Sequence, residues 1–552
     1  TAAGAVRVAG GALELVLPGA FVDGARYPLV LDPLIGTELA AGAGTFDDAE
    51  PDAAFDASTS RYLVVWKRRF SATSGAVRGQ RLLTDGTLDG GTLFFASSGD
   101  VSRPQVADAN HASRFAVAWS QSLAAGDEVR VQACDPTTGA LSQALVVADG
   151  DAGTLSTPDV GGEVLKNPYK QVLVVWDRAG SGIQGAKVEL DVTGDPVLLT
   201  TFGVAADVAL FSQNDAPAIS RTAGHSGLYA VAYLRRAPLI GGVRQVRVAL
   251  VDRDGGLHQP GVDVTASTTD ELPPDIDGGG FADARWVVVN AVDQAAASHA
   301  LIATPLQLLP AGLVAGPSET LSTACESERA AVAWHPGKTY VAWEQDGLFF
   351  DNLVLRGLDP ATCGTCESEA GVAILPAGTT TLGLVMASSG GNYDYSRGLL
   401  VWNEESPDAA STEQDVVGHL LDAFGANSTV QDLGGACGAP GVASAPFPPA
   451  IGNGFFQVLL TGASPAAPFA ILNVAAPQVP FACGACAWVP FASTSVQPVV
   501  AGAAGRILPV PCDPTLVGGQ VDVQWTVVTP LDAPCAAFPG VSVSNRLRLT
   551  VG

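Results

Sequence analysis

The sequence predicts an all-β chain, a seven-bladed β-propeller followed by a C-terminal β-sandwich. Three observations carry this prediction. A short apolar segment, first seen as Arg61-Tyr62-Leu63-Val64-Val65-Trp66, recurs along the chain. Segments that contain proline and turns that contain glycine recur with the same period. Residues after about 435 lack this period but still show alternating apolar and polar residues.

The recurring segment appears in seven copies, separated by 53, 57, 57, 57, 53 and 59 residues when their last positions are compared. A period of this size indicates repeated supersecondary units. Each copy is too short for a helix and is rich in β-branched and aromatic residues, which favours a strand buried on both faces. The copies end at Trp66, Trp119, Trp176, Tyr233, Asn290, Trp343 and Trp402.

Further features recur with the core segment in most of the predicted units. Upstream, a proline is expected to open a strand, as in Pro51-Asp52, Pro104-Gln105, Pro158-Asp159, Pro217-Ala218 and Pro274-Asp275. Proline suits a strand's first residue because no ladder donor is needed there. Downstream come turns such as Asp85-Gly86 and Asp254-Gly255, and then a fourth apolar run. Four antiparallel strands per unit are typical of a propeller blade.

The domain limits follow from where the period starts and stops. Residues 1–35 are expected to form an N-terminal strand segment, 36–434 the propeller and 435–552 the β-sandwich. Residues 36–41 resemble a fourth strand and are predicted to close the last blade, since a ring must hide its edges. Alternatively, 428–433 closes that blade locally. Six or eight blades also remain possible.

Composition limits the classes of partner. The chain has 552 residues, a net charge of −26 and a pI of about 4.4. Such an acidic surface disfavours nucleic acid and anionic membranes. No stretch is long and apolar enough to span a membrane. Nine cysteines fit an oxidising compartment, so we expect a secreted, extracellular or cell-surface protein. The opening residues indicate an interior or processed start, and we expect a mature product that is a fragment of a longer precursor.

The cysteines are expected to form structural disulfides rather than zinc or redox sites, because the two CxxC pairs fall in different predicted domains. Cys512 and Cys535 flank one strand and are a plausible pair. Cys437 could reach Cys483 or Cys486, and Cys325 could reach Cys363 or Cys366. Cys134 is the expected odd residue. Spacing alone fixes no pairing.

Acidic residues gather in the loops that enter each unit, which raises the possibility of a calcium site. The candidate ligands are Asp149, Asp151, Asp252 and Asp254, although their segments are too short for known calcium loops. A solvated acidic rim explains them equally well. No other metal, cofactor or catalytic residue is predicted, since hydrolase elbows, HExxH motifs and P-loops are missing from the sequence.

Unit one carries a resemblance through Pro51, Tyr62 to Trp66, Gly79-Gln80-Arg81 and Asp85-Gly86. These segments resemble repeats in secreted bacterial β-propeller proteins. The C-terminal residues Val523-Gln524-Trp525 and Ser544-Asn545-Arg546 resemble a β-module found in similar proteins. The resemblance implies fold and secretion and carries over no catalytic residue.

The function expected from these features is a non-enzymatic extracellular structural or adhesive protein. Its propeller would be a scaffold for binding other proteins or glycans, and its sandwich would be a docking module. One alternative is a carbohydrate-active enzyme, hydrolase or lyase, which would need two buried acids with shifted pKa values in a central pocket. Another is self-assembly as a subunit of an extracellular filament.

Overall fold

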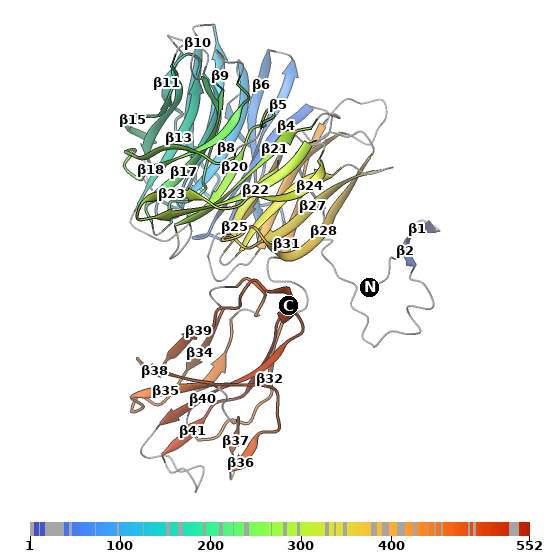
Figure 1. The fold of residues 1–552 in the computed structure, drawn as a ribbon, viewed down its shortest axis with the longest axis vertical. Coiled ribbons are helices and arrows are strands. Elements are labelled where there is room, and N and C mark those ends of the chain that lie inside the picture. Colours follow the sequence, from blue (N-terminus) through green and yellow to red (C-terminus); the bar gives the residue numbers. More distant parts are fainter. Residues whose placement is uncertain are drawn as a thin grey trace.

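The computed structural model describes residues 5–9, 12–16, 38–42, 47–71, 73–96, 99–124, 126–150, 155–163, 169–190, 195–208, 213–224, 226–236, 242–265, 268–279, 284–294, 299–325, 330–335, 338–345, 350–376, 383–388, 397–405, 414–422, 428–438, 440–446, 449–453, 456–483, 486–489, 493–528 and 540–552. These residues form β-strands almost throughout, and the larger part of them is a β-propeller (Figure 1). No described helix is long and apolar enough to cross a lipid bilayer.

The first four sheets each contain four antiparallel strands in chain order. Each recurring apolar segment of this region lies in the second strand of its sheet, flanked on both sides. The strands are β4 (Asp47–Asp56), β5 (Arg61–Ser71), β6 (Ser74–Leu83), β7 (Leu93–Ala96), β8 (Asp100–Ala109), β9 (Arg114–Leu123), β10 (Gly126–Cys134), β11 (Leu145–Asp149), β12 (Leu155–Gly161), β13 (Gln171–Arg178), β14 (Gly182–Glu189), β15 (Val197–Ala206), β16 (Gln213–Ile219), β17 (Leu228–Arg236), β18 (Gln245–Asp252) and β19 (Leu257–Asp263).

The next region differs from the predicted separate units, because its strands form one nine-stranded sheet. A five-stranded part, β20 to β24, and a four-stranded part, β25 to β28, are joined only where Cys325 of β24 pairs with Gln345 of β26. The strands are β20 (Asp275–Gly278), β21 (Arg285–Asp293), β22 (His299–Leu309), β23 (Gly312–Ala315), β24 (Glu319–Cys325), β25 (Ala331–His335), β26 (Lys338–Gln345), β27 (Phe350–Leu358) and β28 (Thr365–Pro376). The recurring segments again lie in inner strands, β21 and β26.

The last propeller sheet combines segments from both ends of the chain. It contains β29 (Leu384–Ser388), β30 (Arg397–Glu405), β31 (Gln414–Asp422) and β3 (Glu38–Gly42). β3 pairs antiparallel with β31, with Glu38 opposite His419. The strand expected at 36–41 therefore lies beside β31, shifted by one or two residues.

Apolar side chains fill the space between successive sheets. Val65 and Val117 belong to one buried cluster between the first two sheets. Trp66 and Val401 belong to another that joins the first sheet to the last. Trp66 is 0% exposed, as expected for packing between sheets and not for a sugar-binding platform. These clusters close the ring.

The C-terminal part contains a six-stranded and a three-stranded sheet around one buried cluster that includes Val458, Leu472 and Trp525. The strands are β32 (Thr429–Asp432), β33 (Val442–Ser444), β34 (Gln457–Thr461), β35 (Phe469–Ala475), β36 (Phe481–Cys483), β37 (Cys486–Trp488), β38 (Ser493–Pro498), β39 (Ala504–Ile507), β40 (Gln520–Val528), β41 (Val541–Val543) and β42 (Leu547–Thr550), with a 3-10 turn η2 (Pro514–Leu516).

The expected boundary between the propeller and the C-terminal unit needs correction. β32 pairs with β42, so residues 428–433 do not close a propeller sheet and the C-terminal unit begins before residue 435. At the other end, β1 (Ala5–Ala9) pairs only with β2 (Ala12–Val16) among the described strands.

Candidate functional site

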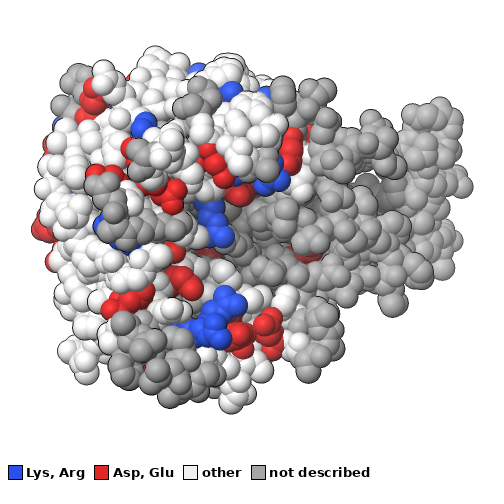
Figure 2. Space-filling model, turned by 90° about the horizontal axis from the view of Figure 1, so that it is seen from above, with Lys and Arg blue, Asp and Glu red and all other residues white. Residues whose placement is uncertain are grey.

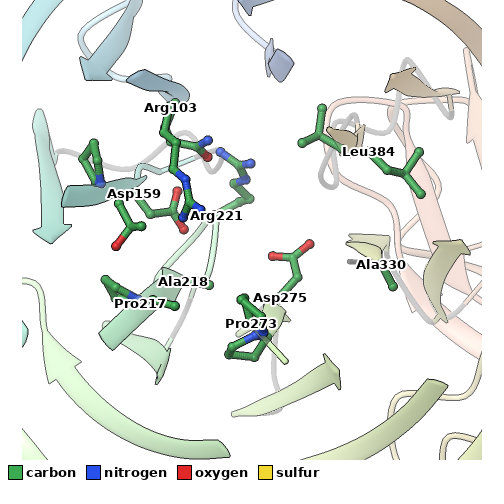
Figure 3. A pocket seen from close by; sticks show the side chains of 15 residues that line it. Arg103, Asp159, Pro217, Ala218, Arg221, Pro273, Asp275, Ala330 and Leu384 are labelled. Atoms are coloured by element: carbon green, nitrogen blue, oxygen red, sulfur yellow. The ribbon is translucent and has the colours of Figure 1, made fainter. Parts of the chain in front are cut away.

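The innermost strands of the propeller surround a pocket near its axis. Its lining includes Arg103, Asp159, Arg221 and Asp275, and it encloses about 620 Å³ of space that is partly open to solvent. Figure 3 shows Arg103, Asp159 and Arg221 together on one side, with Asp275 near the middle and Leu384 and Ala330 opposite. On the face seen in Figure 2, acidic and basic side chains gather around a central hollow.

A β-bulge that recurs in the innermost strands shapes this pocket. In the first four sheets the innermost strand has a register shift at its proline. The strand begins before the proline, which follows a bulge. The prediction that the proline is the first residue of the strand is therefore wrong. Such bulges are common on edge strands next to active sites, where proline is also tolerated. The residue before each proline has a left-handed backbone, namely Glu50 (φ 54°), Arg103 (φ 47°), Thr157 (φ 45°) and Ala216 (φ 49°).

In alternate sheets, a carboxylate at the residue after the proline forms a hydrogen bond with the next sheet. Asp52 accepts a hydrogen bond from the backbone N–H of the next sheet at Val106, at 2.6 Å. Asp159 does the same with Ile219 at 2.8 Å, and Asp275 with Val332 at 2.9 Å. The equivalent residues in the second and fourth sheets are Gln105 and Ala218. The alternation places three carboxyl groups close to the axis.

Arg221 follows β16 and extends across the axis. Its guanidinium donates to both carboxylate oxygens of Asp52, at 2.6 and 2.9 Å, and to the carbonyl oxygen of Val106 at 2.7 Å. Burial alone would lower the pKa of Arg221, but the carboxylates of Asp52 and Asp159 outweigh it and raise that pKa. Arg221 is therefore a fixed cation that holds two distant sheets in place.

The pKa values of Asp159 and Asp275 lie above those of ordinary aspartic acid side chains. Burial raises the pKa of Asp159 to about 7, against the lowering effect of Arg221. Burial likewise raises the pKa of Asp275 to about 6, again opposed by Arg221. Both groups line the same pocket, so two carboxyl groups able to exchange protons near neutral pH lie in one place.

A second chamber shares Arg221 with the axial pocket. Asp108 and Asp277 also line this second chamber. Burial, with the nearby carboxylates of Asp56 and Glu163, raises the pKa of Asp108 well above its usual range. Neither carboxyl oxygen of Asp108 has a hydrogen-bonding partner among the described atoms. A neutral, protonated Asp108 fits these surroundings.

Three of the four calcium candidates are described and make other contacts. Asp252 accepts the backbone N–H groups of Asp254 and Gly256 at 2.9 and 2.8 Å, which forms a turn. Asp254 pairs with Lys187 at 2.6 Å. Asp149 contributes its carbonyl oxygen to Arg178, and Asp151 lies outside the described residues. Within the described ranges no group of three or more residues that could hold a metal ion is present.

The acidic entry loops are occupied by ion pairs instead. Asp48 receives a bidentate contact from Arg68, with nitrogen–oxygen distances of 2.7 and 2.6 Å. Lys67 contacts Asp100 at 3.1 Å, and an exposed pair joins Arg69 to Asp47 at 2.9 Å. The basic residues near the end of β5 therefore neutralise this part of the acidic rim.

Two disulfides are present in the described part. Cys437 pairs with Cys486, one of the two partners expected for it. Cys512 pairs with Cys366 and not with Cys535, whose surroundings are outside the described residues. Cys363 and Cys134 are buried free thiols, so neither Cys363 nor Cys366 bonds to Cys325. Cys366 of β28 and Cys512 of the C-terminal part are far apart in sequence and meet only in the folded chain, so sequence spacing did not indicate this pair.

Comparisons with known proteins give matches among solved structures. No family model matches the sequence, and no curated protein is similar to it. An ulvan lyase, a polysaccharide lyase, is similar in structure with a TM-score of 0.45 and 8% identity, over 70% of this chain and 96% of that one. An α-L-arabinofuranosidase from Fusarium graminearum matches with a TM-score of 0.37, 10% identity and coverages of 70% and 98%. An α-L-arabinanase from Penicillium chrysogenum gives 0.37, 11%, 70% and 99%.

These three proteins are carbohydrate-active enzymes, and activity does not transfer at such low identity. One expectation is corrected by the pocket itself, which holds the two buried acids with raised pKa values that the enzymatic alternative required. The expectation of a non-enzymatic structural or adhesive protein is therefore replaced by the enzymatic alternative.

Sequence reasoning missed the pocket residues. A signal was available for the carboxylates, because the Pro-Asp pairs at 51–52, 158–159 and 274–275 recur in every second unit. None was available for Arg221, because the residues at the same distance after the other unit prolines are Phe55, Asp108, Gly162 and Gly278.

Proposed function

We propose that this protein is a carbohydrate-active enzyme that cleaves a glycosidic bond in the axial pocket. Asp159 would donate the proton to the leaving oxygen, and Asp275 would be the carboxylate that acts on the other side of the bond. The observation that supports this is the pair of pocket carboxyl groups with pKa values of about 7 and about 6. Cleavage of glycosides by two carboxyl groups needs one protonated and one ionised.

The assignment of roles follows from proton affinity. At pH 7 Asp159 keeps its proton for about half of the time, whereas Asp275 is mostly ionised. Each carboxyl group already accepts two backbone N–H groups, Asp159 from Val160 and Ile219 and Asp275 from Ile276 and Val332. These contacts hold the side chains in fixed orientations, which acid–base catalysis requires.

The opposite wall offers a surface for the sugar ring. Ala330, Leu384 and Val385 line the pocket across from the charged residues. Ligand sites commonly combine apolar lining with a few polar groups that fix orientation. The C–H face of a sugar would pack on Leu384 while its hydroxyl groups meet Gln105 and the carboxyls.

We further infer a ring of seven blades, with the C-terminal sheets forming a β-sandwich and residues 1–35 lying outside the ring. Seven recurring core strands support the count, and β24 and β25 divide the nine-stranded sheet into two blades. The two disulfides and the cysteine content support a secreted protein of the bacterial propeller-repeat type that acts on extracellular glycans.

The test is a panel of plant, algal and bacterial polysaccharides incubated with the purified full chain. Released reducing ends report hydrolysis, and the ultraviolet absorbance of an unsaturated sugar reports elimination. Asp159→Asn and Asp275→Asn should each lower turnover by about a hundredfold to ten-thousandfold. Asp108→Asn is the matched control, a buried carboxyl with raised pKa in the other chamber, and should leave turnover unchanged. Equal loss in all three variants, or no cleavage of any glycan, contradicts the proposal.

A further inference from the structure

The guanidinium of Arg103 lies in the axial pocket without a counter-ion. Its backbone N–H donates to Glu50 at 2.6 Å, but its side chain makes no ion pair or hydrogen bond with another described residue. Burial lowers the pKa of Arg103, since the nearby charges of Glu50 and Asp177 do not compensate for the lost water. A partly buried cation without a partner is costly and is rare unless a ligand binds it.

Several other buried or half-buried arginines of the described propeller form ion pairs. Arg68 contacts Asp48, Arg221 contacts Asp52 and Arg253 contacts Glu163, with nitrogen–oxygen distances of 2.6 Å in each case. Arg221, the other cation that lines the pocket, is fully engaged by Asp52 and the carbonyl of Val106. Of the two cations that line the pocket, Arg103 is thus the one that remains for a ligand.

The carboxylates near Arg103 are used by other donors. Glu50 accepts the backbone N–H of Arg103 itself. Asp177 accepts the hydroxyl of Ser156 at 2.8 Å and also that of Thr157. Neither carboxylate forms a hydrogen bond or ion pair with the guanidinium, so these contacts hold the Arg103 backbone in place and leave its head group unpaired among the described residues.

The backbone of Arg103 adds a second, independent observation. It is left-handed at φ 47° directly before Pro104, a conformation that costs free energy for a residue with a side chain and is further disfavoured before proline. Strained bulge residues concentrate at binding sites because the bulge re-aims a side chain. Here the bulge directs the side chain into the pocket, beside Asp159 and Arg221 (Figure 3).

We propose that Arg103 binds an anionic substituent of the glycan that occupies the pocket, so that the substrate is an acidic saccharide carrying a carboxylate or sulfate group. This inference rests on the proposed function, which places a glycan in the pocket. A guanidinium presents a planar fork of donors that matches a carboxylate or sulfate in two parallel hydrogen bonds. A neutral sugar would leave that fork unpaired.

Calorimetric titration of the full chain carrying Asp159→Asn, which prevents turnover during binding, tests the inference. The probes are tri-galacturonate, its neutral methyl ester and a sulfated galactan oligosaccharide. Arg103→Gln should weaken binding of the anionic probe by about tenfold to a hundredfold and leave the methyl ester unaffected. Arg103→Lys should recover only part of the loss, because a lysine lacks the fork. Arg130→Gln, at an arginine paired with Glu128 outside the pocket, is the control.

The outcomes separate this inference from the proposed function. Tighter binding of tri-galacturonate than of its ester supports a carboxylate ligand, and preference for the sulfated probe supports a sulfate ligand. Equal binding of anionic and neutral probes, or no binding of either acidic probe, overturns the role of Arg103 even if the wild type cleaves neutral glycans. Conversely, Arg103-dependent anion binding without any effect of Asp159→Asn on turnover contradicts the catalytic assignment alone.

Discussion

Arg221 and Asp52 are 169 residues apart in sequence and meet across the propeller axis, with a nitrogen–oxygen distance of 2.6 Å. Asp52 is fully buried, while Arg221 is 22% exposed toward the pocket. Because Asp52 also accepts the N–H of Val106, one carboxylate links the first, second and fourth sheets. The floor of the proposed catalytic pocket is therefore also a structural centre of the ring.

Removing this cation should destabilise the fold. Arg221→Ala leaves Asp52 as an uncompensated buried charge, and we expect a loss of about 3–5 kcal/mol in the free energy of unfolding. Denaturant titration followed by tryptophan fluorescence measures it. Arg69→Ala removes the exposed pair with Asp47 and should cost less than about 1 kcal/mol. Similar losses in both variants would contradict a special role for the axial pair.

The two pocket acids should make stability fall as the pH rises. Their pKa values in the folded protein, about 7 for Asp159 and about 6 for Asp275, lie above those of the unfolded chain. Between about pH 4, the usual value for a free aspartate, and pH 7 the folded state therefore binds more protons than the unfolded state. The stabilisation from this difference is complete below pH 4 and is lost as the pH passes through 6 and 7.

Melting temperatures across this pH range check the prediction, with Asp159→Asn as the comparison. The variant cannot ionise at this position, so its stability should depend less steeply on pH than that of the wild type. Asp254→Asn, at an exposed carboxylate whose pKa Lys187 lowers, should not flatten the profile. An unchanged slope in Asp159→Asn would exclude a raised pKa for Asp159.

The left-handed bulge positions predict an uncommon stabilising substitution. Ala216 adopts φ 49° before Pro217, and a glycine there removes the clash of the Cβ atom. We expect Ala216→Gly to raise the free energy of unfolding by up to about 1 kcal/mol. Ala218→Gly, two residues further along the same strand, should instead lower it by about 0.5–1 kcal/mol. Equilibrium denaturation measures both changes in the free energy of unfolding. Destabilisation by Ala216→Gly would show that the backbone of Ala216 is not strained.

The disulfide between Cys366 and Cys512 should stabilise the chain strongly, because the residues it joins are 146 apart. Loop-closure entropy predicts about 5 kcal/mol for such a loop, compared with about 4 kcal/mol for the 49-residue separation of Cys437 and Cys486. Cys366→Ser/Cys512→Ser should therefore lower the melting temperature at least as much as Cys437→Ser/Cys486→Ser. Non-reducing peptide mapping checks the pairing itself, and a Cys512–Cys535 peptide would contradict it.

Local periodicity was enough to predict the strands but not the pocket. The segment ending at Trp66 is too short for a helix and rich in β-branched and aromatic residues, which predicts a buried strand. The structure places it inside a sheet. The Arg221–Asp52 and Cys366–Cys512 contacts depend on how whole sheets are arranged, which spacing cannot give. The bulges before Pro51 and Pro104 were misassigned as strand starts because proline suits both positions.

The pairing of β3 with β31 predicts that the ring depends on a strand from the beginning of the chain. Deleting residues 1–42 removes β3 and leaves the hydrogen-bonding groups of β31 unpaired at a sheet edge, which favours association between chains. We expect the truncated protein to melt at a lower temperature and to form oligomers in size-exclusion chromatography. Deleting residues 1–35 removes β1 and β2 but keeps β3, and should leave both properties close to those of the full chain. If the two deletions behave alike, β3 does not close the ring, and the last sheet is complete without it.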